Sequence, residues 1–373
     1  MYKKEKIPLS FIIYLFIFSI FSIISISSAS LYISKTVGNL AIKQISWYLI
    51  GLLFIYGFCK IKTKTIYKYA WYFYFFNILL LFGLILFGEE INGSKSWYTI
   101  DGFGSFQPSE FMKIPIILMN AIVIQYYMKK NTTIKEEFKM IIILFILFLI
   151  PSILCFLQPD TGSVIIFFII TFSMLFVSGI RKQWFYIFFS LILIFILIFF
   201  YLYFYNKELF LDIFGNQFFY RMDRIMNWSN KSGMQLSNSL MAIGSSGIIG
   251  HGINNPPIYI PEADTDFIFS IYASNFGLLG TIILLLSFFL FDLQIIKISK
   301  NCKKRRNKYV LVGIFSILLY QQIQNIGMTI GLIPITGITL PFISYGGSSL
   351  LSYLILIGII INIKNDEKKN DLL

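Results

Sequence analysis

Three carboxylates stand directly before a long apolar run of the sequence. The stretch PEADTDFIF contains Glu262, Asp264 and Asp266, and the apolar run begins immediately after the last of them. A carboxylate at the border between water and an apolar phase suits a general base, because partial desolvation raises its pKa. Asp266 is the candidate for that role. Its alternative role is to stabilise the positive end of a helix, whereas Glu262 and Asp264 fit solvated loop acids.

Four further clusters contain side chains suited to a phosphorylated or glycosyl substrate presented from a lipid. Arg and Lys suit a phosphate, whereas Trp and Tyr suit the apolar face of a sugar ring. The clusters are NGSKSWYTIDGFGSFQPSEFMK, with Trp97, Tyr98, Gln107, Glu110 and Lys113; LQPDTGS, with Gln158, Asp160 and Thr161; FFYRMDRIMNW, with Arg221, Arg224 and Trp228; and NIGMTIGLIPITGITLPFISYGGSS. The last places Pro and Gly at membrane depth, where non-helical backbone must be buried in protein or line a wet cavity.

Each candidate also has a simpler structural interpretation. Glu110 and Lys113 fit an i,i+3 ion pair at the start of a helix. Asp160 fits a turn-forming acid before Thr-Gly. Arg221 fits a solvated amphipathic face. The residue types alone therefore leave both interpretations open for all four.

The composition indicates that a membrane positions these residues. Of the 373 residues, 57% are hydrophobic and 13% charged, and the mean hydropathy is +0.75. Soluble domains carry about 25% charged residues. The net charge of +13 is spread over short loops between apolar runs, so it indicates topology rather than a nucleic-acid partner. The three cysteines have no paired spacing, and no disulfide framework or metal site is expected.

Ten apolar runs have about the length that a bilayer requires. The first is longer than the apolar region of a signal peptide, so it is predicted to remain as a helix. The fold class is therefore all-α and polytopic, and residues 1–373 form a single transmembrane domain without an internal repeat. The predicted spans are 8–29, 40–59, 69–88, 108–128, 140–157, 162–180, 184–205, 266–291, 309–330 and 346–363.

The basic residues predict the orientation of these spans. With the N-terminus inside, 23 of the 31 Lys and Arg residues lie on the inner side, as the positive-inside rule requires. Both termini are then cytoplasmic. The larger outer loops are 89–107, 206–265 and 331–345, and the second of them contains the three acids. The predicted cavity therefore faces outward.

The ordered motifs resemble the SEDS family of RodA, FtsW and SpoVE proteins. They are NGSKSWY…FQPSEFMKI, QPDTGS, YRMDRI…QLSNSLMAIGSSGIIGHG, IPEADTDFIFSI and NIGMTIGLIPITGITLPFISYGGSSLLSY, and they cover nearly the whole chain. The resemblance implies an inverting peptidoglycan glycosyltransferase of the bacterial cytoplasmic (inner) membrane. Such enzymes polymerise lipid II, an undecaprenyl-pyrophosphate-linked disaccharide-pentapeptide, into β-1,4-linked glycan at the outer face. A class B penicillin-binding protein is the implied partner.

The resemblance also implies roles for individual residues. The Asp of the TDFIF motif is the essential acid of the family and corresponds to Asp266. The expected substrate-binding residues are Glu110, Lys113, Arg221, Asp160 and Trp97. Lys113 and Arg221 are candidates to offset the charge of the pyrophosphate. The sequence specifies no cofactor, and a divalent cation such as Mg²⁺ or Mn²⁺ is a further candidate for that task.

The sequence departs from the family pattern at four positions. Ser274 and Asn275 stand where relatives usually have a Glu pair, His251 stands where they have Lys or Gln, and GSSG stands at 244–247 where they have GSGG. NIGM and FQPSEFMKI resemble the RodA branch, whereas YIPEADTDFIF and ITLPFISYGGSSLL resemble the FtsW branch. We predict a RodA-like role in cell elongation and rod shape, with an FtsW-like role at the division septum as the alternative.

Two functions of other classes compete with this prediction. A lipid II flippase would place ionisable residues near the bilayer midplane, but the candidate residues gather at the outer boundary. A scaffold without enzymatic activity would not need the cluster of acids, cations and aromatic rings.

Overall fold

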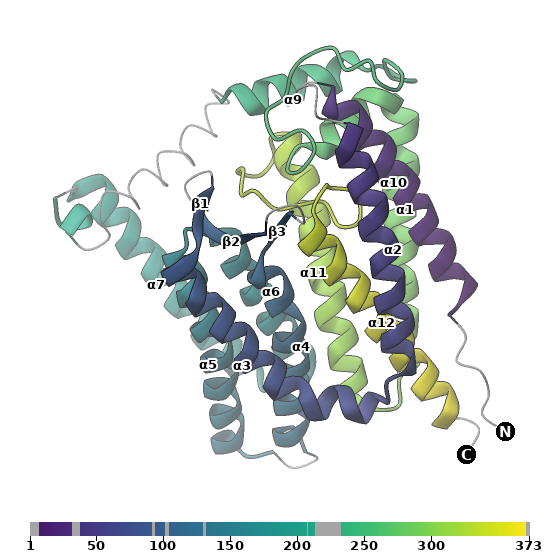
Figure 1. Ribbon diagram of the computed structural model, residues 1–373. Helices are drawn as coiled ribbons and strands as arrows, with labels where there is room; N and C mark the ends of the chain where they lie inside the picture. The colour runs from purple at the N-terminus through teal and green to yellow at the C-terminus, as the bar shows by residue number, and fades with distance from the viewer. Residues whose placement is uncertain are drawn as a thin grey trace.

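The computed structural model describes residues 7–31, 38–91, 94–100, 104–129, 132–206, 208–212 and 233–370. Ten long helices make up most of this part of the chain (Figure 1). They are α1 (Leu9–Ser30), α2 (Gly38–Lys60), α3 (Thr63–Phe87), α4 (Pro108–Tyr127), α5 (Ile134–Leu157), α6 (Thr161–Ser178), α7 (Lys182–Tyr205), α10 (Ile268–Lys300), α11 (Arg305–Thr329) and α12 (Gly347–Asn370). A shorter helix, α9 (Met234–Ser245), precedes α10.

These ten helices correspond to the ten predicted spans. In the described part of the chain, nine of them are long and apolar enough to cross a bilayer. The tenth, α4, has 20 residues and carries Glu110 and Lys113. The prediction of an all-α polytopic membrane protein is confirmed.

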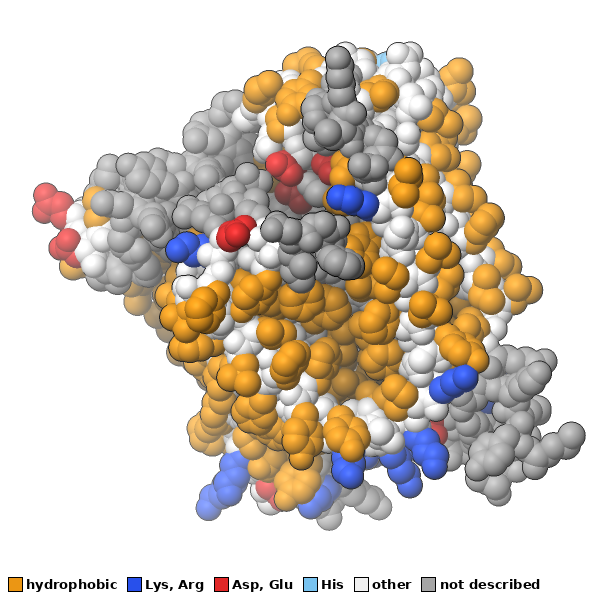
Figure 2. Space-filling model, viewed as in Figure 1, with side chains coloured by type: hydrophobic (Ala, Val, Ile, Leu, Met, Phe, Trp, Pro, Cys, Tyr) orange, Lys and Arg blue, Asp and Glu red, His pale blue; other side chains and the backbone are white. Residues whose placement is uncertain are grey.

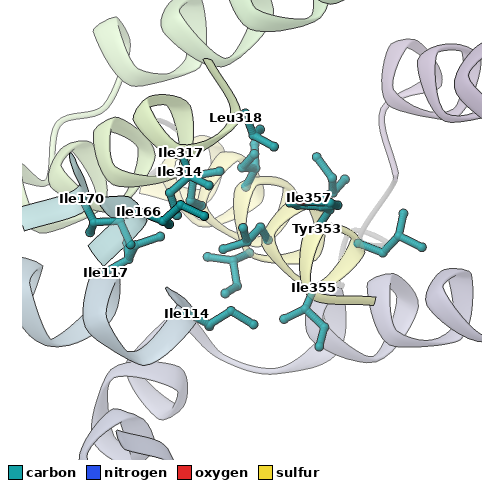
Figure 3. Packing of buried hydrophobic residues seen from close by; sticks show 14 of the residues in the cluster. Ile114, Ile117, Ile166, Ile170, Ile314, Ile317, Leu318, Tyr353, Ile355 and Ile357 are labelled. Carbon is teal, nitrogen blue, oxygen red and sulfur yellow. The ribbon is translucent and has the colours of Figure 1, made fainter. Parts of the chain in front are cut away.

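Helix α4 lies at the centre of the bundle. It packs against α3, α5, α6, α11 and α12, and most of its side chains are buried. Figure 3 shows Ile117 of α4 near Ile166 of α6 and Ile314 of α11. Within a bilayer this packing stabilises the bundle mainly through van der Waals contact, because lipid tails are as apolar as the side chains.

Helix α7, unlike α4, is almost entirely exposed. Phe199 is its one buried residue, and the helix extends away from the bundle (Figure 1). Its remaining apolar side chains are typical of a lipid-facing surface. Lys and Arg side chains gather at one end of the molecule in Figure 2, whereas most visible Asp and Glu side chains lie toward the other end.

A small antiparallel sheet occupies most of the predicted loop 89–107, and the sequence did not indicate it. The central strand pairs with both of the others, placing Trp97 opposite Glu89. The hydroxyl of Tyr98 donates a hydrogen bond to the Leu80 carbonyl at 2.8 Å, which ties the sheet to α3. The strands are β1 (Glu89–Ile91), β2 (Ser94–Ile100) and β3 (Gly104–Phe106).

Helix α10 is interrupted near its start by close backbone packing. Gly277 has φ 63° and ψ −159° inside the helix, and a Cβ atom at this position would lie 2.4 Å from the Gly250 nitrogen. Both positions therefore require glycine. The His251 N–H donates to the Ser274 carbonyl at 2.9 Å, which joins the segment after α9 to the first turns of α10.

The charge distribution predicts that the end of the bundle with Asp266 faces outward. Ser245→Cys places an exposed thiol at that end, and Asn301→Cys places one at the other. An impermeant thiol reagent, applied to cells whose outer barrier has been opened, should label Ser245→Cys directly. It should label Asn301→Cys only after lysis. The wild-type protein is the control because Cys302 is half-buried, and the reverse labelling pattern would overturn the orientation.

Candidate active site

A buried asparagine fixes the backbone around Asp266. Asn325 of α11 is fully buried, and its side-chain amide donates to the carbonyl oxygens of Asp266 and Ile338, each at 2.8 Å. The Asp266 Oδ2 atom faces Gly337, where a Cβ atom would lie 3.4 Å away from it. One amide therefore joins the Asp266 turn to the non-helical connection 331–346 between α11 and α12.

Other buried polar groups hold the same connection in place. The Ser344 hydroxyl donates to the Thr265 carbonyl at 2.6 Å, and the Tyr345 N–H donates to the Asp264 carbonyl at 2.8 Å. From α2, the Gln44 amide donates to the Ser344 carbonyl at 3.1 Å. These bonds satisfy backbone groups that neither a helix nor lipid could satisfy.

The carboxyl group of Asp266 is poised to exchange a proton near neutral pH. Burial raises its pKa to about 7, and the negative charges of Glu262 and Asp264 raise it further. Among the described residues it forms no ion pair. A general base works best when its pKa is near the operating pH, so this carboxyl group has the properties that catalysis requires.

Asp160 is the N-cap of α6, and its carboxylate accepts four hydrogen bonds. Two come from the N–H and hydroxyl of Ser163, at 3.1 and 2.7 Å. The others come from the Ser109 hydroxyl at 2.9 Å and the Gln107 amide at 3.2 Å. These contacts explain Asp160 as a link between the N-terminal ends of α4 and α6. Its role in binding substrate stays a prediction.

Glu110 and Lys113 form an ion pair of 2.5 Å on one face of α4. Lys113 is fully buried, and Glu110 is 8% exposed. The Lys113 ammonium also lies 5.2 Å from the centre of the Tyr353 ring, and the Tyr353 hydroxyl is 3.1 Å from that of Thr339. The pair thus supports the connection after α11, and its contact with substrate stays a prediction.

The non-helical connection 331–346 lies between two predicted site residues, Asp160 and Asp266. A Cβ atom at Gly162, at the start of α6, would lie 3.3 Å from the Thr336 carbonyl oxygen. The next residue along, Gly337, faces Asp266. The start of α6, which Asp160 caps, therefore borders the same short stretch as the candidate base.

The remaining predicted residues do not join this group in the described chain. Trp97 is half-buried on β2. Arg221, Arg224 and Trp228 lie outside the described residues.

The sequence reasoning missed Asn325, which carries no charge. The signal available for it was the run YQQIQNIGM, which places four amide side chains within a span.

The candidate divalent cation would need ligands beyond those that the protein supplies. Within the described ranges, no group of three or more His, Cys, Asp or Glu side chains is placed to hold a metal. Mg²⁺ commonly binds through one or two carboxylates together with substrate phosphates. The described residues alone therefore do not form a complete metal site.

Comparison with known proteins identifies the family. The sequence model described as "Cell cycle protein", which covers FtsW, RodA and SpoVE, matches residues 8–369. The chain belongs to this family. It is 35% identical over 356 residues to the "Probable peptidoglycan glycosyltransferase FtsW" of Wigglesworthia glossinidia brevipalpis, covering 92% of this chain and 89% of that protein. It is 34% identical over 306 residues to the "Stage V sporulation protein E" of Bacillus subtilis, covering 77% and 76%.

Solved structures share the fold of this FtsW/RodA/SpoVE family member. A chain from "Structural coordination of polymerization and crosslinking by a peptidoglycan synthase complex" matches with a TM-score of 0.75 and 24% identity, covering 95% of this chain and 97% of that one. The rod shape determining protein RodA of Thermus thermophilus matches with a TM-score of 0.69 and 22% identity, covering 96% and 97%. Both matches extend over the helices that position Asp266.

The buried ion pair predicts a stability test that separates structure from function. Glu110→Gln leaves the Lys113 ammonium buried without a counter-charge and should lower the stability by about 3–5 kcal/mol. Glu110→Gln/Lys113→Met removes both charges and should regain most of that loss. Thermal unfolding in detergent measures both effects. A single variant as stable as the wild type would contradict the pairing, and an inactive but stable double variant would support a role toward substrate.

The raised pKa of Asp266 predicts that its charge destabilises the folded protein. The pKa of Asp266 in the folded protein, about 7, lies above the ordinary Asp value of 3.8. The Asp266 carboxyl group therefore does not lower the free energy of unfolding below pH 4. Its destabilising effect grows as the pH rises toward 7. Asp266→Asn should stabilise the protein at pH 8 by about 1–3 kcal/mol, and by less at pH 5. Thermal unfolding at both pH values tests this, with the exposed Glu262→Gln as control. An equal effect of the two variants at pH 8 would refute the assignment.

Proposed function

We propose that this chain is a peptidoglycan glycosyltransferase that polymerises lipid II into β-1,4-linked glycan. The family membership and the names of its relatives support the reaction class. The observation that carries the proposal is the Asp266 carboxyl group, half-buried at the start of α10 with a pKa raised to about 7. It is placed where a polar sugar meets an apolar bundle.

In the proposed reaction, Asp266 removes the proton from the 4-hydroxyl of the acceptor N-acetylglucosamine. The hydroxyl oxygen attacks the anomeric carbon of the donor, and the bond to undecaprenyl pyrophosphate breaks with its electron pair. A single displacement converts the α-linked donor into a β-linked product, so no covalent intermediate with the enzyme is needed. Asp266 then returns its proton to water or to the departing phosphate.

The departing pyrophosphate needs positive charge nearby. Lys113 is buried against Glu110 and Tyr353, so its charge is already largely balanced. We therefore assign the main contact to Arg221, which lies outside the described residues. A divalent cation held by the pyrophosphate and the nearby carboxylates would serve the same purpose.

The proposed setting is the outer face of the bacterial cytoplasmic membrane, with both termini inside. One solved structure with the same fold belongs to a peptidoglycan synthase complex. We propose that a class B penicillin-binding protein is likewise the partner of this chain and supplies crosslinking. For the cellular role we retain elongation, as in RodA, with septal synthesis as in FtsW as the alternative.

A lipid II flippase is the rival function to exclude by experiment. Asp292 is an acidic side chain buried within α10, one residue beyond the predicted span 266–291, as a transport mechanism would use. Purified protein with labelled lipid II separates the two functions, because only a glycosyltransferase forms glycan in detergent without a membrane to cross.

Replacement of the candidate base should abolish most activity without loss of the protein. Asp266→Asn retains the size and much of the hydrogen bonding of the carboxylate but cannot accept the proton. The rate of lipid II polymerisation should fall about 10²–10⁴-fold. In the wild type the rate should rise with pH around a midpoint of about 7, as Asp266 ionises. Polymerisation by purified protein with its partner measures both.

Two matched variants and an abundance check complete this test. Glu262→Gln and Asp264→Asn change neighbouring acids of the same turn and should affect the rate much less. Membrane abundance of each variant shows whether a lost rate reflects lost protein. Near-normal polymerisation by Asp266→Asn at normal abundance would refute the assignment and move the search to Glu110 and Asp160.

A further inference from the structure

A polar cavity lies at the end of the bundle away from Asp266. Helix α11 begins at Arg305 beside this cavity and reaches Asn325, the partner of the Asp266 turn, about 20 residues or about 30 Å later. That distance is about one hydrocarbon thickness. The cavity has a volume of about 320 Å³ and is lined by Met128, Val177, Ser178, Arg305, Lys308 and Tyr309.

Two cations border the cavity without an acidic partner. Arg305 and Lys308 are exposed, and within the described residues the Lys308 side chain forms no ion pair or hydrogen bond. Arg305 makes a long hydrogen bond of 3.5 Å to the Met128 carbonyl at the end of α4, so most of its donors are available. The nearby acid Asp366 is engaged by Lys304 at 2.6 Å. Within the described residues, no acidic side chain forms an ion pair with Arg305 or Lys308.

The helix ends around the cavity do not add to this field. The N-terminus of α11 carries a positive partial charge, but the buried Glu367 carboxylate already accepts hydrogen bonds from the Lys303 and Lys304 N–H groups, at 2.9 and 3.3 Å. The carbonyl ends of α4 and α6 have the opposite sign, and Arg305 offsets one of them by its bond to Met128. An anion held between Arg305 and Lys308 would thus meet two full positive charges, and the helix N-terminus is already occupied by Glu367.

The other side of the cavity is apolar and continues into the lipid-facing surface. Val177 lines the cavity and is 39% exposed, and its neighbour Phe176 is 68% exposed. Tyr126, one turn or less from the end of α4, is also exposed, as aromatic side chains at the membrane interface commonly are. Figure 2 shows that the apolar surface gives way to Lys and Arg at this end.

We infer that this cavity binds the headgroup of an anionic phospholipid. The phosphodiester lies between Arg305 and Lys308, and the acyl chains follow the apolar surface of α6 past Val177 and Phe176. Basic pockets between membrane helices bind anionic headgroups in this way. A free phosphate would use the cations alone and would gain nothing from the apolar wall. The inference does not depend on the proposed glycosyltransferase activity or on the orientation of the chain.

The test uses the full chain in neutral detergent with dioleoyl phosphatidylglycerol as the probe. Native mass spectrometry counts the retained lipid, and thermal unfolding reports its stabilising effect. Lys308→Gln and Arg305→Gln should each weaken lipid binding about fivefold, and the double variant should lose both effects. Lys308→Arg should retain binding, which shows that a loss in Lys308→Gln reflects charge and not misfolding.

Lys300→Gln is the matched control. Lys300 is exposed in the last turn of α10, so its replacement makes the same change in net charge outside the cavity. This variant should bind the lipid as the wild type does, and phosphatidylcholine should not compete. Equal lipid binding by the double variant and the wild type would overturn the inference. It would also be overturned if glycerol 3-phosphate alone stabilised the wild type as strongly as the lipid.

Discussion

A non-helical connection within a membrane protein must have all its backbone polar groups paired, because lipid offers no partners. Residues 331–346 form such a connection, and several helices of the bundle supply its hydrogen-bond partners. Asn325 supplies its amide from α11, and Gln44 supplies one from α2. The Ser22 hydroxyl of α1 donates to the Ile343 carbonyl at 2.7 Å. Helices α1 and α2, from the other end of the sequence, are thus held with α11 around one loop. Asn325 and Ser344 of this network also hold the turn that carries Asp266.

The candidate residues differ in how far their charges are compensated by neighbouring groups. Glu110 and Lys113 balance each other, and four donors stabilise the Asp160 carboxylate. Asn325 bonds the backbone of Asp266 and leaves its carboxyl group without such compensation. Burial then raises the pKa of Asp266, whereas Glu110 and Asp160 are compensated by their partners. Of these three predicted site acids, Asp266 is therefore the one whose carboxyl group is left to accept a proton.

The sequence predicts features whose signal lies within one segment of the chain. It does not predict features that depend on contacts between segments distant in sequence. Ten apolar runs of bilayer length each predict a helix without knowledge of the others. The sheet at 89–106 was missed because its strands are short and their pairing depends on contacts with α3. The partnership of Gln44 with Ser344 joins residues 300 positions apart, and no local pattern indicates it. For Asp160 the sequence offered a turn or a substrate ligand, and the contacts explain it as a helix cap.

Three residues that depart from the family pattern, His251, Ser274 and Asn275, form contacts in the first turns of α10. Ser274 is fully buried, so a Glu there would need a cation, and a Lys at position 251 would need an acid. Here both positions are changed together, and the His251 Nδ1 atom lies 3.1 Å from the Ser274 hydroxyl. Asn275 donates to the Ser28 hydroxyl of α1 at 2.9 Å. Ser274 and Asn275 thus form hydrogen bonds at positions where the family resemblance implies acids, and Gly250 packs closely against the break in α10. These contacts join the first turns of α10, which follow Asp266, to α1 and to the segment after α9.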